Sequence, residues 1–462
     1  MTSTDDDGSQ RAELLLGPLL RHVDETSATV WVETSHPTSV SVLHATTDTF
    51  TVHGRHFALM VIEGLEPGTT TPYEVHLGGP TGRRVWPRPD SDLPPSVIRT
   101  PVAGRPVSIL LGSCRAAAPH EPPYTLELTF DAEGRGVDAL WAHGRRMLSQ
   151  SPDAWPDLVL FLGDQIYADD SSPRARQRIA RRRDDDATLP PEVVAGFEEY
   201  CWLYHEAWSA EVERWLLATV PSAMIMDDHD MIDDWNISSS WVDDIRREPW
   251  WFEHLLGGLM SYWVYQHLGN LSPDRIRAEG LLEQLIEAGD GTAILRAHLA
   301  PPSGDEPSVH PYRFSHCRRV GDVTAMVIDC RTARLLTENH RQMLHDGEWA
   351  WVRAELEAVE GHLLIGTSLP VFIADGLHDL QVWNERICAG AWGRPTARVG
   401  EWLRRSLDLE DWSAFGRSYH RFVDLIEELR HRPSGPQSIV VASGDIHFSY
   451  AAEVPPRSPV GI

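Results

Sequence analysis

The chain has 462 residues, of which 42% are apolar and 24% are charged, so it can build a large core and general disorder is excluded. Its 68 acidic against 41 basic residues give a net charge of -27, which repels nucleic acid and anionic surfaces at long range, so we expect no duplex DNA partner. The five cysteines are scattered and lack both a CxxC pair and the density of a disulfide scaffold, which favours a reducing compartment.

The N-terminal residues 1–12 are acidic, and we expect them to form a flexible tail. The apolar run that follows is too short for a signal peptide. No other run reaches the roughly 20 apolar residues that span a bilayer. These features predict a cytoplasmic protein without stable membrane insertion.

Residues 13–104 read as short strands separated by turns, with apolar residues at alternating positions such as Val30 and Val32. This pattern predicts a small all-β sandwich of fibronectin-like type. The segment 87–106 is rich in proline, which lacks a backbone donor, and predicts a stiff linker with a domain boundary. A second domain would then occupy residues 105–462.

Apolar runs separated by helical stretches dominate the second domain and indicate strands buried on both faces of an α/β sheet. The runs are 108–114, 157–164, 222–230, 324–331, 362–369 and 438–447. Each one ends in residues able to bind metal or phosphate. Ligands of α/β folds bind outside the carboxyl ends of the strands, so these ends are expected to share one site. Asp and Ser also cap helices, which is the structural alternative at any single end.

The helical stretches include 191–218 and 241–268, and we expect a helical insertion around 238–300. The second stretch holds four Trp and two Tyr. They could form an aromatic wall over the site, although packing in the core is the more frequent use of such a pattern.

Two strand ends are rich in carboxylates. In GDQIY (163–167) the glycine allows a tight exit from the strand, so Asp164 can project at the sheet edge with Tyr167 close behind. MDDHD (226–230) places Asp228 and His229 among further acids. Two such charges at 4 Å repel by about 4 kcal/mol at an effective dielectric near 20, so a bound cation is favoured over a bare cluster. A loop that spreads its acids into solvent is the alternative.

Two other strand ends offer softer ligands. In SGDIHFS (443–449), Asp445 and His447 are two residues apart and can point to one side of an extended segment to hold one ion. LLGSCR (110–115) places Cys114 beside Arg115 at a strand end. A lone cysteine is more often a small buried apolar residue, so its neighbours carry the functional interpretation.

Taken together, GSC, GDQIY, DDHD and SGDIHFS, in this order, resemble the PhoD-type alkaline phosphatases of the metallophosphatase superfamily. The segments IDCRTAR (328–334) and MLHDGEWAWVRAEL (343–356) are similar to further motifs of that family. The resemblance covers nearly the whole chain. It implies a four-layer α/β/β/α catalytic core behind an N-terminal β-sandwich.

The resemblance also implies the site residues. It predicts an Fe3+ ion and a second metal, typically Ca2+, bridged by Asp164, with the metal ligands Cys114, Asp164, Tyr167, Asp228, Asp445 and His447. His229 matches the histidine that contacts the transferring phosphoryl group. Asp233 and Asp234 stand where the family commonly has Asn, which leaves the identity of the second metal open. The chain ends fifteen residues after His447, where the resemblance leads us to expect further strands.

The expected reaction is hydrolysis of a phosphate ester, carried by a small molecule or a polymer. Two cations about 3.5 to 4 Å apart would lower the pKa of a water from 15.7 toward roughly 7. His229 and either Arg115 or Arg331 would stabilise the phosphoryl charge, although a structural salt bridge is as good an interpretation for each arginine. Two alternatives stay open: a phosphodiesterase of the phospholipase D or cell-wall-polymer type, and a noncatalytic binding protein that retains the fold.

Overall fold

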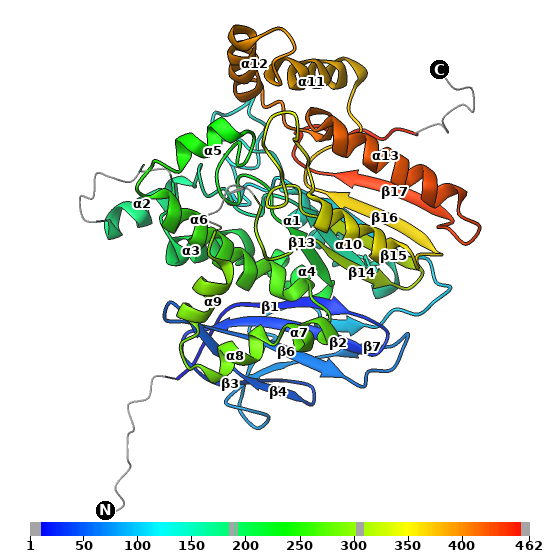
Figure 1. Cartoon of the computed structure of the whole chain (residues 1–462). Coiled ribbons are helices and arrows are strands. Elements are labelled where there is room, and N and C mark those ends of the chain that lie inside the picture. Colours follow the sequence, from blue (N-terminus) through cyan, green and yellow to red (C-terminus); the bar gives the residue numbers. More distant parts are fainter. Residues whose placement is uncertain (1–10, 184–189, 191–192, 302–308, 454–462) are drawn as a thin grey trace, which may run out of the picture.

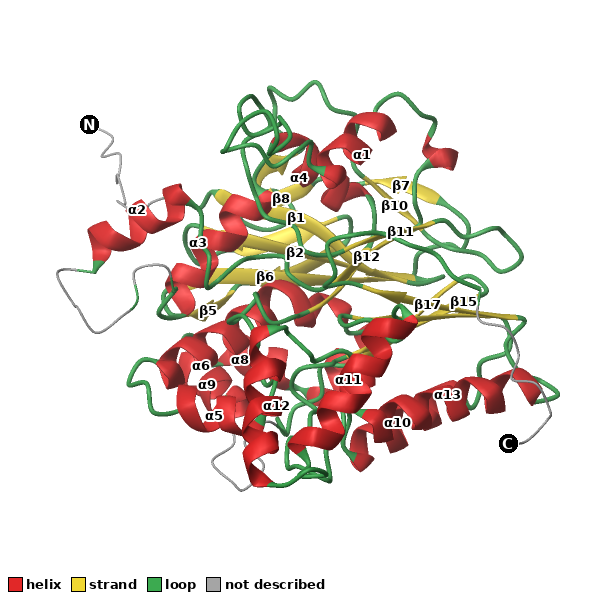
Figure 2. Cartoon of the chain, turned by 90° about the horizontal axis from the view of Figure 1, so that it is seen from above, coloured by secondary structure: helices red, strands yellow, loops and turns green. Residues whose placement is uncertain are grey.

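The computed structural model describes residues 11–183, 190, 193–301 and 309–453. These residues form a mixed α/β protein with five sheets and thirteen α-helices (Figures 1 and 2). Most of the tail predicted at residues 1–12, namely residues 1–10, lies outside the described part of the chain. Within the described part, no helix has the length and apolar character needed to cross a membrane.

The first strands form two antiparallel sheets. One sheet has the order β1 (Leu14–Val23), β2 (Ser27–Thr34), β6 (Arg55–Glu63) and β5 (Phe50–Val52), and the other has the order β4 (Ala45–Asp48), β3 (Ser39–Val42), β8 (Val75–Leu77) and β9 (Arg83–Trp86). Val30 and Val32 of β2 pack with Val40 and Val42 of β3 in one buried cluster, as their alternation predicted. Trp31 points to the opposite face and belongs to the main core of the chain. The sheet that contains β2 is therefore buried on both faces.

The segment predicted as a linker contributes a strand. Within residues 87–106, β10 (Val97–Arg99) pairs antiparallel with β7 (Thr70–Pro72). The proline-rich sequence on both sides concealed this three-residue strand. The domain boundary placed near residue 104 stays a prediction.

All six apolar runs predicted in the second half contain a strand. A parallel sheet has the order β11 (Ile109–Gly112), β12 (Leu158–Leu162) and β13 (Ser222–Ile225), and a mixed sheet has the order β14 (His316–Val320), β15 (Val323–Ile328), β16 (His362–Thr367) and β17 (Ser438–Ser443). A Cβ added to Gly366 would lie 2.7 Å from Leu162 Cδ2, so β16 and β12 approach face to face. The strands of the two sheets that carry predicted ligands bring their carboxyl ends together.

The helices surround these sheets. They are α1 (Ala139–Met147), α2 (Pro173–Arg182), α3 (Phe197–Trp208), α4 (Glu211–Thr219), α5 (Ser239–Ile245), α6 (Trp251–Tyr262), α7 (Pro273–Glu279), α8 (Leu281–Glu287), α9 (Thr292–Leu299), α10 (Asp346–Leu356), α11 (Asp375–Cys388), α12 (Arg394–Ser406) and α13 (Gly416–His431). Figure 2 shows α10 and α13 on one side of the sheets and α1 and α4 on the other. The exact four-layer order stays a prediction.

The segment predicted as a helical insertion is helical in the structure. Helices α5 to α9 fill residues 239–299 together with a π-helical turn at Trp263–His267. Its aromatic residues Trp241, Trp251, Tyr262, Trp263 and Tyr265 are at most 8% exposed. They pack in the core, so the interpretation as an aromatic wall over the site is wrong for these five side chains.

Candidate functional site

Three strand ends share one local geometry. Two residues after β11, β12 and β17 the chain reaches Cys114, Asp164 and Asp445, and these have φ angles of 52°, 44° and 68°. Left-handed backbone costs about 1 to 3 kcal/mol outside glycine and gathers at functional sites. The turns are also tied together, because Cys114 N donates to Gly163 O at 3.3 Å and Cys114 Sγ donates to Asp445 O at 3.5 Å. The structure thus brings together three predicted ligands from the carboxyl ends of strands in two sheets.

Three carboxylates form the centre of the site. Asp164, Asp227 and Asp228 each offer an oxygen, these oxygens lie within 4.8 Å of one another, and all three side chains are buried. Gly163 makes this approach feasible, since it has a φ of 112° and a Cβ at its position would lie 2.7 Å from Asp227 Cβ. Asp164 and Asp228 were predicted from the sequence, and Asp227 is an addition.

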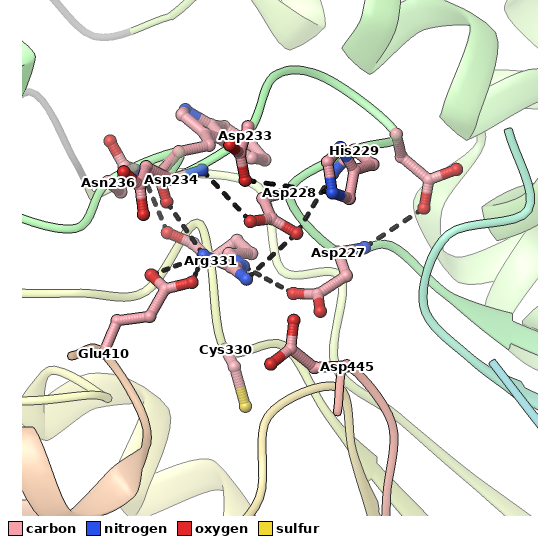
Figure 3. Close-up of polar contacts among 12 residues, drawn as sticks. Asp227, Asp228, His229, Asp233, Asp234, Asn236, Cys330, Arg331, Glu410 and Asp445 are labelled. Atoms are coloured by element: carbon pink, nitrogen blue, oxygen red, sulfur yellow. Dashed lines mark hydrogen bonds and ion pairs between the residues drawn. The ribbon is translucent and has the colours of Figure 1, made fainter. Parts of the chain in front are cut away.

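Arg331 balances part of this negative charge (Figure 3). Its fully buried guanidinium lies 2.5 Å from Asp227, 3.2 Å from Asp228 and 2.7 Å from Glu410. Burial disfavours ionisation of Asp228, but the charges of Arg331 and His229 and the hydrogen bond from Asp234 N together outweigh it and lower the pKa of that carboxyl. Of the two interpretations of Arg331, the structure fits the buried salt bridge.

The negative charge that Arg331 does not balance favours a bound cation. Burial raises the pKa of Asp164 well above its usual range and the pKa of Asp227 to about 6, and neighbouring carboxylates add to the rise at Asp164. Among the described residues, Asp164 Oδ1 and Asp227 Oδ2 are buried without a hydrogen-bond partner. Buried carboxylate oxygens without donors are costly, and hard cations prefer such oxygens as ligands. The donor set therefore fits a bound metal.

His229 lies at the rim of the cluster with its ring held in place. Its Nδ1 lies 3.0 Å from both oxygens of Asp169, and its ring centroid is 4.7 Å from that of Tyr167. Burial would lower the pKa of His229, but the hydrogen bond to Asp169 and the nearby acids raise it to about 11. The imidazole is thus a charged donor, and Tyr167, the predicted iron ligand, packs against it.

Of the predicted site residues, Asp164 and Asp228 belong to the carboxylate cluster. Arg115 and His447 are among those that lie outside it. Arg115 forms ion pairs with Asp138 at 2.8 Å and with Glu213 at 3.1 Å, so its guanidinium serves a structural network. The side chain of His447 is exposed. It lines an open groove of about 2440 Å³ together with Cys114 and Tyr167. The groove also contains Arg174, Arg176 and Arg178 of α2, the basic helix next to the GDQIY motif.

Sequence reasoning missed three residues of the site. Asp227 had a signal, because it is the first of the paired acids in MDDHD. Asp169 also had a sequence signal, since it follows GDQIY within the same acid-rich segment. Glu410 had none, because only the fold brings it 2.7 Å from Arg331.

Comparisons with known proteins point to one family for the part of the chain that holds these motifs. Residues 139–252 match the model of the PhoD-like phosphatase family, and this range holds Asp164, Tyr167, Asp228 and His229. A solved structure described as "Structure of PhoD" aligns with 94% of this chain and 72% of its own length, at a TM-score of 0.55 and 12% identity. Both findings support a PhoD-like assignment, and the family model itself covers residues 139–252. At this identity, the structural likeness on its own shows the PhoD fold.

Other comparisons add less. Residues 11–98 match a model described as a domain of unknown function, DUF7800. The type III pullulan hydrolase from Thermococcus kodakarensis aligns with 52% of this chain and 46% of its own length, at 11% identity and a TM-score of 0.13, and carries no argument. A search of curated proteins finds no match.

Proposed function

We propose that the protein is a metal-dependent phosphoesterase that hydrolyses phosphate esters. The match of residues 139–252 to the PhoD-like phosphatase family supports this reaction class. The observation that carries the metal dependence is the pair of buried carboxylate oxygens without donors, Asp164 Oδ1 and Asp227 Oδ2, at the ends of two adjacent parallel strands. A noncatalytic relative would have no need to keep these acids buried together at such a cost.

The chain supplies ligands of two kinds. Asp164, Asp227 and Asp228 would hold a metal through their oxygens. By likeness to the family, Cys114, Tyr167, Asp445 and His447 would complete sites for Fe3+ and Ca2+. When bound, the metals would polarise the phosphoryl group and activate a water.

The residues around the metals hold charge and orientation. Asp169 fixes Nδ1 of His229, which leaves Nε2 as a cationic donor to a phosphoryl oxygen. Arg331 prevents full repulsion among the acids before a metal binds, since it contacts Asp227 and Asp228. Arg115 is not needed for this step, because Asp138 and Glu213 already occupy its guanidinium.

The groove favours a diester in an extended chain as a second candidate substrate. Its volume of about 2440 Å³ exceeds the 300 to 1,000 Å³ typical of pockets for small molecules. Arg174, Arg176 and Arg178 supply positive charge along it, within a strongly acidic protein. These features suit the phosphodiesterase alternative, with a polyanionic substrate lying along α2.

Hydrolysis of p-nitrophenyl phosphate and bis(p-nitrophenyl) phosphate, measured beside elemental analysis, tests the proposal. We expect bound metal in the purified protein, and a loss of metal and of roughly a hundredfold or more in activity for Asp164→Asn. Asp243→Asn, which removes an exposed acid of α5, is the matched control and should change neither. Metal-free protein that is inert toward both esters after metal is added would contradict the proposal.

A further inference from the structure

Helices α11 and α12 form a hairpin that projects from the body of the molecule (Figure 1). One face of each helix packs against the other helix. Asn384 Nδ2 donates to Gly400 O at 2.8 Å, and a Cβ added at Gly400 would lie 2.9 Å from Ile387 and 3.0 Å from Cys388. The glycine thus allows close packing of the pair, and the other face of the hairpin is left in solvent.

That outer face is unusually apolar for a surface. Its exposed members are Trp383 (38%), Trp392 (65%), Val399 (56%), Trp402 (65%) and Leu407 (52%). The rings of Trp383 in α11 and Trp392 in the turn between the two helices pack at a centroid distance of 6.0 Å, so the apolar surface continues from α11 onto the tip of the hairpin. Contiguous exposed apolar patches of this kind mark interaction sites.

The same face carries positive charge. Arg386, Arg394 and Arg398 are exposed, and the described residues supply no ion-pair partner for them. Of the acids in the hairpin, Glu385 and Glu401 contact Gly416 and Arg404, and the exposed Asp375 and Asp379 lie in the N-terminal half of α11. The hairpin tip is therefore cationic, although the whole chain has a net charge of -27.

We propose that this hairpin tip docks the protein on an anionic lipid surface. Tryptophan prefers the boundary between headgroups and acyl chains, and arginine pairs with lipid phosphates, so the two residue types together suit adsorption to a membrane surface. The overall negative charge does not oppose this at contact, because it is screened beyond about 8 Å at physiological salt. A second copy of the chain fits less well, since its own arginines would meet the same arginines.

The hairpin is also fixed to the body beside the candidate site. Arg405 pairs with Asp244 at 2.8 Å, and Arg404 pairs with Glu338 at 2.6 Å. Glu410, shortly after α12, is the partner of Arg331. Docking through the tip would therefore hold the candidate site close to the lipid surface. The docking itself does not depend on the proposed phosphoesterase activity.

Sedimentation with vesicles tests the inference. The full chain is mixed at low salt with vesicles of phosphatidylcholine and phosphatidylglycerol, or with vesicles of phosphatidylcholine alone. We expect sedimentation with the anionic vesicles, and a roughly tenfold or greater loss of binding for Arg394→Gln/Arg398→Gln, because each arginine near an anionic surface contributes appreciably. Trp392→Ala/Trp402→Ala should lose binding to a similar extent.

Matched controls separate docking from general changes in charge or folding. Arg88→Gln/Arg105→Gln removes two exposed arginines elsewhere, and Phe130→Ala removes an aromatic side chain that is 78% exposed. Both should bind vesicles like the unmodified protein, and circular dichroism should show that every variant is folded. The inference is overturned if the unmodified protein does not bind the anionic vesicles, or if the hairpin variants bind them equally well. It is also overturned if the protein binds no vesicles but forms a dimer in light scattering that Trp392→Ala/Trp402→Ala abolishes.

Discussion

Asp169 holds the imidazole of His229 through two contacts of 3.0 Å between its carboxylate oxygens and Nδ1. The two residues come from different loops, one after β12 and the other after β13. Asp169 is itself fixed, because Asp233 N donates to it at 2.6 Å. The orientation of the ring thus depends on a residue that need not touch the substrate.

Replacing Asp169 should therefore weaken the proposed reaction through His229. For Asp169→Asn we expect kcat/KM to fall by roughly 10 to 100 fold, as for other residues that orient a functional group. Asp169 is the main cause that raises the pKa of His229 to about 11, so the alkaline limb of the pH profile should move to lower pH. Asp170→Asn, whose side chain is 79% exposed, is the control. An unchanged pH profile would exclude this role.

Removing Arg331 should destabilise the fold. Arg331→Met leaves Asp227 buried without its cation, although Glu410 keeps Arg334, and breaking a buried pair in this way costs about 3 to 5 kcal/mol. The free energy of unfolding in urea, measured without added metal, provides the test. Arg353→Met breaks a pair with Glu428 whose side chains are 43% and 59% exposed, and it should cost about 1 kcal/mol or less. Equal effects of the two changes would show that the buried network is not needed.

Metal binding should strengthen as the pH rises. Burial raises the pKa of Asp227 to about 6, so a metal must displace a proton from it at lower pH. In the metal-free protein the pH dependence of stability has the opposite sign. The pKa of Asp227 in the folded chain exceeds its ordinary value of 3.8, so its contribution to stability is present below pH 3.8 and is lost as the pH rises through 6.

Thermal unfolding at pH 5 and pH 8 measures both effects. With chelator present, the stabilisation that Asp227 contributes should be smaller at pH 8, and Asp227→Asn should remove this difference. Added Ca2+ or Fe3+ should raise the Tm more at pH 8 than at pH 5. A metal-induced shift that is equal at both values would argue against carboxylate ligands.

A histidine far from the site should make the fold sensitive to acid. His316 of β14 is buried, and this burial, aided by the charge of Arg318, lowers its pKa from 6.5 to about 3. The folded pKa is depressed, so this contribution is fully present above pH 6.5 and is lost as the pH falls toward 3, at up to about 1.4 kcal/mol per pH unit.

The variant His316→Gln should unfold with a weaker dependence on pH between 6.5 and 4.5, when compared with the unmodified chain in urea. His340→Gln, which changes an exposed histidine outside the proposed ligand set, should keep the original dependence. Identical slopes for His316→Gln and the unmodified chain would show that His316 does not carry the effect.

Local sequence predicted those parts of the fold whose signal is local. The run before Asp164 is continuously apolar and ends in glycine, and β12 lies there. β14 was missed because HCRRV reads as polar, yet Arg318 is buried in it. Its guanidinium donates to Ser222 O and Gly269 O, at 3.0 and 3.2 Å, which are distant in sequence. No local pattern contains those partners.

The residues of the candidate site likewise fall into those that local sequence predicts and those that only the fold brings together. Asp164 and Asp228 could be predicted because glycine and paired acids follow apolar strands, and the structure places both in the cluster. The salt bridge of Arg331 with Glu410 could not be predicted, since 79 positions separate its members and neither lies in an acid-rich strand end. Arg115 looked functional from its neighbour Cys114, but only the fold shows that Glu213 engages it.

The sheet of β1, β2, β6 and β5 has a consequence for any attempt to shorten the protein. Its outer face supplies Trp31 and Phe57, whose rings lie 5.1 and 5.5 Å from Tyr265, and Tyr265 Oη donates to Glu33. A gene fragment that starts at residue 105 would leave Tyr265 and its neighbours uncovered, and such a product is expected to aggregate on expression. The sheet and the helical segment that packs on it are thus expected to fold only when both are present in one chain.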